Sequence, residues 1–231
     1  MTDKHLHQRG LILIISGPSG CGKDTVSDML SKHEPYIART ITTTSRSPRA
    51  GEKDGVDYNF ISHEAFEQLI SQGHFLEYNE FVGNYYGVPR GPVEEKLAKG
   101  RDVIFVIDWN GARKLKAAMP EDVVSIFLLP PSLEDLRKRL ENRGQDGADI
   151  IEKRLQQGKI DITHYDEYDY VVLNDDLDSV LRRFQRILRA ERLRRHRQPW
   201  LDNFVQKLLD GEKPELDDGY TDDGNTSANI S

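Results

Sequence analysis

Residues 17–24 read Gly-Pro-Ser-Gly-Cys-Gly-Lys-Asp, a phosphate-binding loop that is complete except at its last position. The apolar run 11–15 before it predicts a strand, and residues 25–32 after it have the apolar spacing of a helix. Glycines let backbone N–H groups turn toward phosphate oxygens, the helix N-terminus adds positive potential, and Lys23 adds a cation. The chain is therefore expected to build a strand, loop and helix that bind a nucleoside triphosphate.

Asp24 stands where the motif usually has Ser or Thr. A carboxylate there can bind Mg²⁺, although it also brings negative charge close to the β-phosphate. Alternatively, Asp24 is only an acidic first-turn residue favoured by the helix dipole. Thr25 has a hydroxyl but is expected to point elsewhere on the helix. The sequence leaves both interpretations of Asp24 open.

Length and composition set further bounds. The 231 residues suffice for one α/β domain with a small insertion or tail. The single cysteine, Cys21, excludes an internal disulfide framework and fits a reducing, cytoplasmic setting. No apolar stretch reaches the length of a membrane span, and the first residues lack the core of a signal peptide. The net charge of −7 argues against a general nucleic-acid binder, and the oligomeric state stays open, a homo-oligomer included.

Charge is unevenly distributed near the C-terminus. Residues 181–197 are strongly basic, but their apolar residues recur at helical intervals, so we expect the arginines to form the exposed face of a C-terminal helix. The alternative is a surface that binds anions or RNA. Residues 211–231 are acidic and without periodicity, which predicts a disordered tail.

The rest of the chain alternates between strand and helix patterns. Unbroken apolar runs at 103–107 and 123–129 suit parallel strands covered on both faces. With further helix and strand patterns, they predict an α/β fold with a parallel central sheet and helices on both faces. The further elements are expected as helices at 91–99, 132–141 and 147–160, a strand at 170–173, and a final helix. A β-rich segment interrupts the alternation, with a strand at 58–61, a helix capped by Ser62, and a hairpin turning at residues 83–84.

A second group of polar residues lies in this β-rich segment. Arg46 and Arg49, in a turn with hydroxyls such as Thr42 nearby, could hold a phosphate through charge-assisted bonds; the alternative is a solvated basic turn. Tyr58 and Tyr86 could donate to the same phosphate or stack on a base.

Two carboxylates complete the second group. Glu77 ends a strand, and its oxygens could accept from adjacent N–H groups of guanine. Asp108 follows a buried strand, where ligands bind in open α/β sheets. Each alone could equally be a surface or capping residue.

Taken together, these motifs resemble the guanylate kinase family. The resemblance covers roughly residues 10–210, and residues 190–194 are similar to its bacterial branch. The motifs that carry it lie at residues 17–23, 46–52, 57–60, 83–87, 107–111 and 172–176.

The resemblance implies a P-loop kinase that transfers the γ-phosphate of ATP to GMP or dGMP with Mg²⁺. It implies one domain over 1–210, a β-rich nucleoside-monophosphate-binding insertion, a helical lid, and a tail. The expected ranges are 10–41, 91–135 and 161–210 for the core, 42–90 for the insertion, 136–160 for the lid and 211–231 for the tail.

The resemblance also assigns roles by position. The ATP-binding residues would be Gly17, Pro18, Ser19, Gly20, Cys21, Gly22, Lys23, Asp24 and Thr25, with Asn174 and Asp175 beside the adenine. The GMP phosphate would be held by Thr42, Arg46, Arg49, Tyr58 and Tyr86, and the guanine read by Glu77 and Asp108. The catalytic cations would be Lys23, Arg49, Arg139, Arg143 and Arg154, the last three from the lid. The resemblance assigns no carboxylate to position 24, so Asp24 is the candidate metal ligand on its own chemistry, with the helix-dipole role as the alternative.

Three positions depart from the family pattern: Asp24, Val88 and Val106. Val88 replaces a hydroxyl of the guanine pocket, and Val106 replaces an acidic residue near the metal, for which Asp24 could compensate. Gly-Lys-Asp and Tyr-Tyr-Gly-Val are also similar to ribose 1,5-bisphosphate phosphokinase, a relative that phosphorylates a sugar phosphate. Glu77 has no use in that reaction, so we favour a nucleoside monophosphate.

A binding module without catalysis is the alternative of a different class. Scaffolds similar to guanylate kinase can dispense with the phosphate-binding loop. Here Gly17, Gly22 and Lys23 are intact, which favours turnover.

Overall fold

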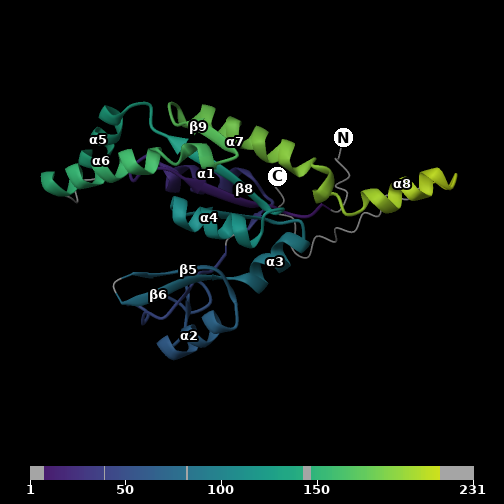
Figure 1. The fold of residues 1–231 in the computed structure, drawn as a ribbon, viewed down its shortest axis with the longest axis horizontal. Helices are drawn as coiled ribbons and strands as arrows, with labels where there is room; N and C mark the ends of the chain where they lie inside the picture. Colours follow the sequence, from purple (N-terminus) through teal and green to yellow (C-terminus); the bar gives the residue numbers. More distant parts are fainter. Residues whose placement is uncertain (1–7, 39, 82, 143–146, 214–231) are drawn as a thin grey trace, which may run out of the picture.

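The computed structural model describes residues 8–38, 40–81, 83–142 and 147–213. Its centre is a five-stranded sheet in which every neighbouring pair is parallel, as the apolar runs predicted (Figure 1). The strand order is β2 (Ile37–Ala38), β7 (Asp102–Val106), β1 (Ile12–Ser16), β8 (Val123–Leu129) and β9 (Tyr170–Leu173).

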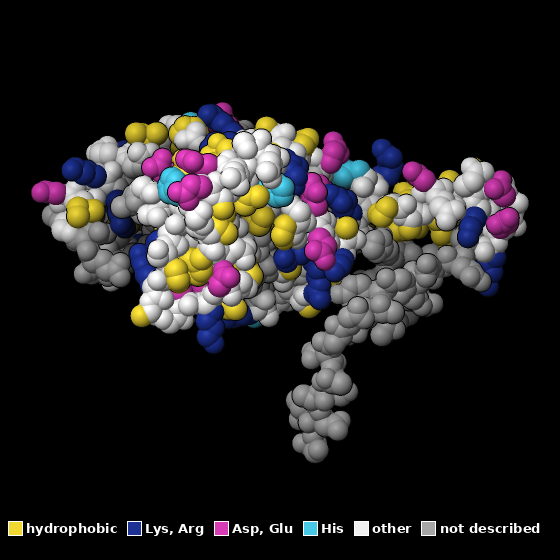
Figure 2. All heavy atoms as spheres, turned by 90° about the horizontal axis from the view of Figure 1, so that it is seen from below, with side chains coloured by type: hydrophobic (Ala, Val, Ile, Leu, Met, Phe, Trp, Pro, Cys, Tyr) yellow, Lys and Arg dark blue, Asp and Glu magenta, His cyan; other side chains and the backbone are white. Residues whose placement is uncertain are grey.

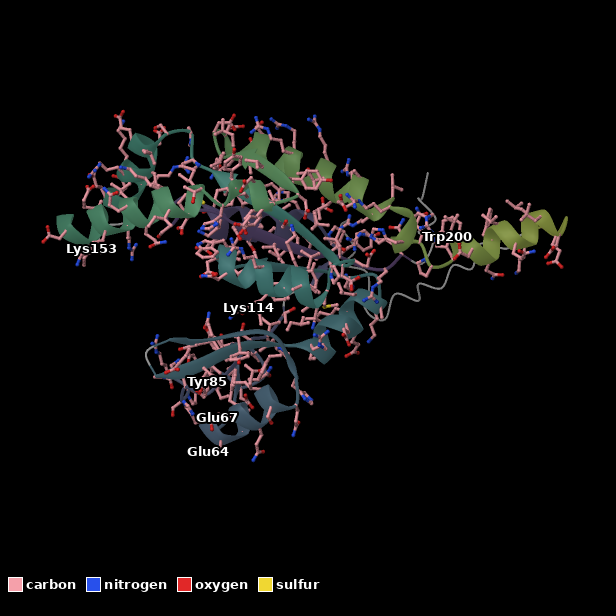
Figure 3. The ribbon with its side chains drawn as sticks, viewed as in Figure 1. Glu64, Glu67, Tyr85, Lys114, Lys153 and Trp200 are labelled. Atoms are coloured by element: carbon pink, nitrogen blue, oxygen red, sulfur yellow. The ribbon has the colours of Figure 1, made fainter. Side chains whose placement is uncertain are left out.

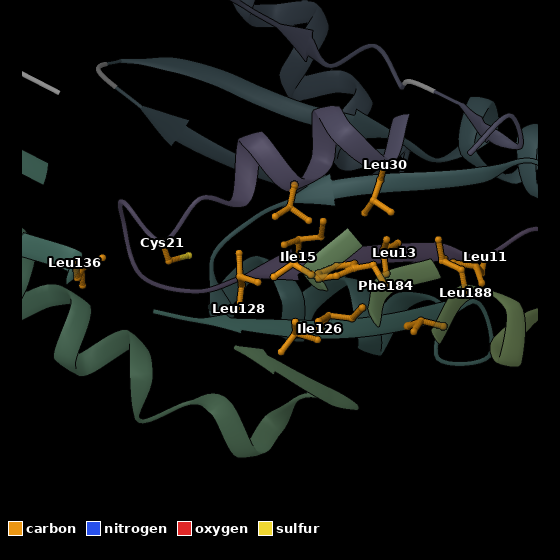
Figure 4. Close-up of a cluster of buried hydrophobic side chains, with 14 of the residues drawn as sticks. Leu11, Leu13, Ile15, Cys21, Leu30, Ile126, Leu128, Leu136, Phe184 and Leu188 are labelled. Carbon is orange, nitrogen blue, oxygen red and sulfur yellow. The ribbon is translucent and has the colours of Figure 1, made fainter. Parts of the chain in front are cut away.

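Helices cover both faces of this sheet because the side chains of a strand point alternately to opposite faces. Leu11, Leu13 and Ile15 belong to one buried cluster, whereas Ile12 and Ile14 belong to another. The first cluster, shown in Figure 4, is closed by α1 (Lys23–His33) and α7 (Leu177–Arg192). The second is closed by α3 (Arg90–Ala98) and α4 (Trp109–Ala118). The α/β architecture expected from the sequence is confirmed.

A second, smaller sheet is formed by the β-rich segment. Its strand order is β4 (Asn59–Phe60), β3 (Thr43–Thr44), β6 (Asn84–Pro89) and β5 (Phe75–Phe81). The hairpin β5–β6 is antiparallel, as predicted, and α2 (His63–Ser71) begins at Ser62, whose Oγ accepts from the backbone N–H of Ala65 at 3.1 Å. The ring of Phe66 on α2 stacks on Phe75 at 4.3 Å between centroids, which fixes the helix to the sheet.

Two helices lie at one end of the central sheet, α5 (Leu133–Asn142) and α6 (Ala148–Ile162) (Figure 1). Leu136 and Leu140 of α5 and Leu155 of α6 are buried in the first cluster. A 3₁₀ turn at Tyr165–Glu167 then leads into β9. These are the helices that the sequence predicted as a lid.

The basic C-terminal segment differs from the prediction of one exposed helix face. Helix α7 ends at Arg192, and a 3₁₀ turn (Arg195–Arg197) and α8 (Leu201–Leu209) follow. The prediction is wrong for Arg192 and Arg197: Arg192 is paired with Asp102 and with Glu34, and Arg197 is only 2% exposed. The physical reason is that the carboxylate of Asp102 is buried at the start of β7 and requires a counter-charge.

Replacing Arg192 with Ala is expected to lower the free energy of unfolding by about 3 kcal/mol, because it leaves Asp102 buried without its cation. Burial already raises the pKa of Asp102, against the opposing effect of Arg192. The control variant Arg186→Ala, on the exposed face of the same helix, should change the free energy of unfolding by less than about 0.5 kcal/mol. Urea titrations measure the free energy of unfolding of both variants. Equal losses of stability in the two variants would contradict a stabilising role for the Arg192–Asp102 ion pair.

In the part of the chain that the structure describes, no helix is both long and apolar enough to cross a membrane.

Candidate active site

The phosphate-binding loop joins β1 to α1, as the sequence predicted. Gly17, Gly20 and Gly22 have φ angles of +146°, +88° and +98°, which L side chains rarely adopt. A Cβ on Gly17 would also lie 2.3 Å from the carbonyl oxygen of Leu128, and one on Gly22 would lie 2.6 Å from Nδ2 of Asn174. Glycine is therefore required at 17 and 22 by both conformation and space.

The side chain of Lys23 folds back on this loop. Its Nζ donates to the carbonyl oxygens of Gly17 at 2.8 Å and Pro18 at 3.0 Å. Both acceptors are neutral, and an anionic phosphate oxygen is a stronger acceptor for an ammonium group. Lys23 is therefore held at the loop and has weaker partners to exchange for a phosphate.

A hollow of about 280 Å³ lies between the loop and the carboxyl end of β7. It brings Lys23 and Asp24 together with Asp108, three residues that the sequence singled out. It also contains Val106 and Asp161, of which Asp161, near the end of α6, was missed. A lone aspartate on a helix gives no sequence signal, because only the fold shows where the end of α6 lies.

The side chain of Asp24 is exposed and makes no hydrogen bond or ion pair with the residues that the structure describes. Thr25 is exposed on the same helix and is not among the residues lining the hollow. No group of three or more metal-binding side chains occurs in the described ranges. Mg²⁺ bound with a triphosphate needs only one or two carboxylates, since phosphate oxygens and waters complete its shell. The free carboxylate of Asp24 beside the hollow fits that requirement.

One carbonyl oxygen of the loop, that of Cys21, accepts from two distant segments. Nδ2 of Asn174 donates to it at 2.5 Å, and Nη1 of Arg139 on α5 donates at 3.2 Å. Nη2 of Arg139 also donates to the carbonyl oxygen of Asn174 at 3.2 Å. The structure therefore brings Arg139 and Asn174 together at the loop. Burial raises the pKa of the Cys21 thiol, which favours the neutral side chain.

The remaining residues predicted beside the adenine or in the lid are Asp175, Arg154 and Arg143. Asp175 is paired with Arg183 of α7 at 3.0 Å, a partner that the sequence did not indicate. Arg154 is half-buried on α6 and does not line the hollow. Arg143 lies outside the described residues.

The predicted phosphate-holding residues meet on the second sheet. The guanidinium of Arg46 lies 5.5 Å from the centroid of the Tyr58 ring, and Tyr58 lies 6.1 Å from the ring of Tyr86. Arg46 Nη2 donates to Oε1 of Glu52 at 2.9 Å, and this contact holds the pKa of Glu52 below its usual range. Glu52 was not predicted as a site residue, yet it orients the arginine.

The other two residues of this group lie beside it in the chain. Glu52 also accepts from the backbone N–H of Arg49 at 2.6 Å, while the Arg49 side chain is exposed. Thr42 is half-buried before β3, and its carbonyl oxygen accepts from the backbone N–H of Asn59 at 2.9 Å. The exposed guanidinium of Arg49 is therefore open to an anion.

Glu77 and Asp108 approach each other between the two sheets. Burial raises the pKa of Glu77, the charge of Asp108 raises it further, and that of Lys114 lowers it. Asp108 also caps α4, because its Oδ1 accepts from the backbone N–H of Gly111 at 2.8 Å. Both the capping and the site interpretation of Asp108 therefore apply.

Lys114 is the cation of this pair of carboxylates, and the sequence missed it. It extends from α4 toward the hairpin, where its Nζ donates to the carbonyl oxygen of Tyr78 at 3.3 Å (Figure 3). Val88, one of the three departures, is 7% exposed and lies opposite Glu77 in the β5–β6 register. The Glu77 site is thus flanked by a cation on one side and an apolar side chain on the other.

Comparison with known sequences connects this arrangement to a family. The sequence model of the guanylate kinase family matches residues 9–191. This chain belongs to that family. It is 47% identical to the guanylate kinase of Maricaulis maris over 203 residues, 88% of this chain and 93% of the relative. It is 50% identical to that of Vibrio parahaemolyticus over 192 residues, covering 82% and 92%.

A solved structure supports the same assignment for the fold. The crystal structure of guanylate kinase from Anaplasma phagocytophilum matches with a TM-score of 0.67 and 38% identity, covering 88% of this chain and 97% of the other. The guanylate kinase fold therefore extends over nearly all of the described residues.

Proposed function

We propose that this protein is a guanylate kinase that transfers the γ-phosphate of ATP to GMP, or dGMP, to give ADP and GDP. The observation that carries the proposal is the position of Asp108, which lines the hollow at the phosphate-binding loop and is close enough to Glu77 to raise its pKa. A triphosphate in the hollow and a guanine beside Glu77 would thus lie on either side of one residue. Family membership and the identity to curated guanylate kinases support the same reaction.

Phosphoryl transfer needs alignment of two anionic substrates and neutralisation of the developing charge, with little covalent chemistry from protein. Lys23 would exchange its loop carbonyls for phosphate oxygens of ATP. Arg139, fixed on the loop, would add a second charge, with Arg143 and Arg154 supplied from the lid. Arg46, Arg49, Tyr58, Tyr86 and Thr42 would hold the phosphate of GMP.

Mg²⁺ bound with ATP would neutralise phosphate charge, and we assign Asp24 to hold it. Val106, which lines the same hollow, cannot contribute a ligand, so Asp24 restores one carboxylate. This assignment concerns the metal requirement alone and can fail while the kinase assignment holds.

Asp24→Ser is expected to raise the Mg²⁺ concentration for half-maximal activity about tenfold, because it removes one carboxylate from the lining of the hollow. Titration of Mn²⁺ binding to the ATP complex by electron paramagnetic resonance gives the same comparison without turnover. Asp28→Ser, one turn further along α1 and also exposed, is the matched control. An unchanged metal requirement in Asp24→Ser would leave Asp24 with only its helix-dipole role.

The acceptor is tested by an assay coupled to ADP release, with GMP, dGMP, AMP, UMP and ribose 1,5-bisphosphate in parallel. We expect GMP to give the highest kcat/KM because the carboxylate oxygens of Glu77 would accept from the N–H groups of guanine. The sugar-phosphate alternative is not favoured, since the relatives at 42–50% identity are guanylate kinases. Faster turnover of ribose 1,5-bisphosphate, or none with any acceptor, would overturn the proposal.

A further inference from the structure

Four side chains form a closed ring of contacts between the start of α4 and the segment that follows α6. Trp109 and Arg113 come from α4, and His164 and Glu167 come from the segment that joins α6 to β9. The indole of Trp109 stacks on the imidazole of His164, with 4.0 Å between ring centroids and 17° between the ring planes. We call these four residues the α4 clamp.

Glu167 closes the α4 clamp through both of its carboxylate oxygens. Nη2 of Arg113 donates to Oε1 at 2.5 Å, and Nε donates to Oε2 at 2.6 Å. Nδ1 of His164 donates to Oε1 at 2.7 Å, because an ionised carboxylate can only accept. The contacts with Arg113 and His164 lower the pKa of Glu167 to about 2, so the carboxylate is ionised at neutral pH. The guanidinium of Arg113 also lies 4.7 Å from the ring centroid of Trp109.

The α4 clamp differs from an ordinary surface ion pair. Figure 2 shows basic and acidic side chains interspersed over one face of the molecule, and exposed pairs generally contribute little. A bidentate arginine pair within a network is the exception. In the α4 clamp every member contacts two others, so none can move without breaking both contacts.

The segment after α6 is fixed to the body of the molecule by further contacts. Nζ of Lys116, also on α4, donates to the carbonyl oxygen of Glu167 at 2.9 Å. The ring of Tyr168 packs edge-on against Phe127 of β8, with 5.1 Å between centroids. Residues 164–168 are therefore anchored, whereas α6 before them extends outward from the end of the central sheet (Figure 1).

The α4 clamp joins two walls of the hollow at the phosphate-binding loop. Asp108, immediately before Trp109, and Asp161, three residues before His164, both line that hollow. The stack of Trp109 on His164 thus sets where Asp161 lies relative to Asp108. Loosening the clamp would change the shape of the hollow without removing any residue that lines it.

The α4 clamp also lies at the base of a lever. Arg154 is about two turns before the end of α6, so the rise of about 1.5 Å per residue places it about 12 Å from the clamp along the helix. A rotation of α6 by about 20° at its base would move Arg154 by about 4 Å. Because a misplacement of about 1 Å can cost as much as about 100-fold in rate, a loose base would slow the transfer.

From these observations we propose that the α4 clamp is the fixed pivot of α6, and that its members are positioning residues for phosphoryl transfer that act through Asp161 and Arg154. The inference rests on the proposed function, because it concerns the alignment of ATP with GMP. None of the four members is among the described residues that line the hollow. Substitutions in the clamp should lower kcat with little effect on the KM for GMP, whose phosphate is assigned to residues of the second sheet.

Substitution of Arg113 tests the clamp at an exposed position. Its side chain is 53% exposed, so Arg113→Ala should leave the fold intact. We expect kcat to fall about tenfold while the KM for GMP changes by less than about twofold. Glu167→Ala should have the same effect. The double variant should stay within about twofold of either single variant, because all three break the same contact.

Glu152→Ala is the matched control for these variants. It removes another ion pair of the lid, in which Glu152 of α6 lies 2.7 Å from Arg137 of α5, away from the clamp. Because this pair does not hold the base of α6, the control should keep wild-type kcat.

Hydrogen exchange measures the same effect without turnover. In Arg113→Ala, amides at the carboxyl end of α6 should exchange at least about fivefold faster than in the wild type, while those of α1 stay unchanged. Unchanged exchange in α6, an equal loss of kcat in Glu152→Ala, or additive losses in the double variant would overturn the pivot. A wild type that does not turn over GMP would overturn the proposed function, and the exchange comparison would still test the clamp.

Discussion

Lys23→Met is expected to lower kcat at least about 100-fold, because it removes a preorganised positive charge from the phosphate-binding loop. The Nζ of Lys23 is held 2.8 Å from the Gly17 carbonyl oxygen, at the edge of the hollow where the triphosphate would lie. Steady-state kinetics with saturating GMP measure the loss. The KM for GMP should change little, since Lys23 is outside the Arg46 group.

Lys32→Met, an exposed lysine on the same helix, is the matched control and should keep wild-type turnover. Thermal unfolding should distinguish a catalytic effect from a folding defect. Among the described residues the Nζ of Lys23 donates only to loop carbonyls, so its removal should cost no more than about 1 kcal/mol of unfolding free energy. A Lys23→Met enzyme with normal kcat would contradict the assignment of the loop as the ATP site.

Glu77→Gln is expected to lower kcat/KM for GMP about 100-fold while the KM for ATP stays nearly unchanged. An amide presents one acceptor and one donor group where guanine N–H groups require two acceptors. The preference for GMP over AMP should therefore shrink by a similar factor. Glu80→Gln, at an exposed position of the same strand, serves as the control. Equal losses in both variants would show that the effect is not specific to Glu77.

The pKa of Glu77 gives this prediction a pH dependence. Because burial raises that pKa, the carboxylate takes up a proton at higher pH than an ordinary glutamate. The KM for GMP should thus rise as the pH falls toward the raised pKa, and Glu77→Gln should lack that rise. Glu77→Gln weakens GMP binding but should stabilise the fold. An ionised carboxylate whose pKa is raised in the folded state opposes folding at neutral pH, so its removal should raise the unfolding temperature.

Local patterns predicted most of the fold. Apolar runs predict the buried strands, and the turn residues 83–84 predict the hairpin, because each signal lies within a few neighbouring residues. Helix α4 was not predicted, because Gly111 interrupts its short apolar pattern, although a capping role was one of the two interpretations left open for Asp108. Local patterns say nothing of α8 either, because none of its residues is buried against the described part of the chain.

The missed site residues share a different cause. Asp161, Lys114 and Glu52 enter the site through tertiary placement, and none belongs to a motif. Arg192 also depends on tertiary placement, because the sequence predicted it on a solvent-exposed helix face and the structure pairs it with buried carboxylates. Whether a charged side chain meets solvent or a buried carboxylate depends on which strand end packs beside it. Helical periodicity alone cannot supply that information.

Because the carbonyl oxygen of Cys21 joins three segments, a substitution in one segment should disturb the phosphate-binding loop. Residues 21, 139 and 174 are distant in the chain, yet their groups meet at this one atom. A change at Asn174, next to the predicted adenine position, would release the loop before it altered any contact to a base. Variants of Asn174 should therefore resemble phosphate-loop defects, with slow phosphoryl transfer and little change in the KM for GMP.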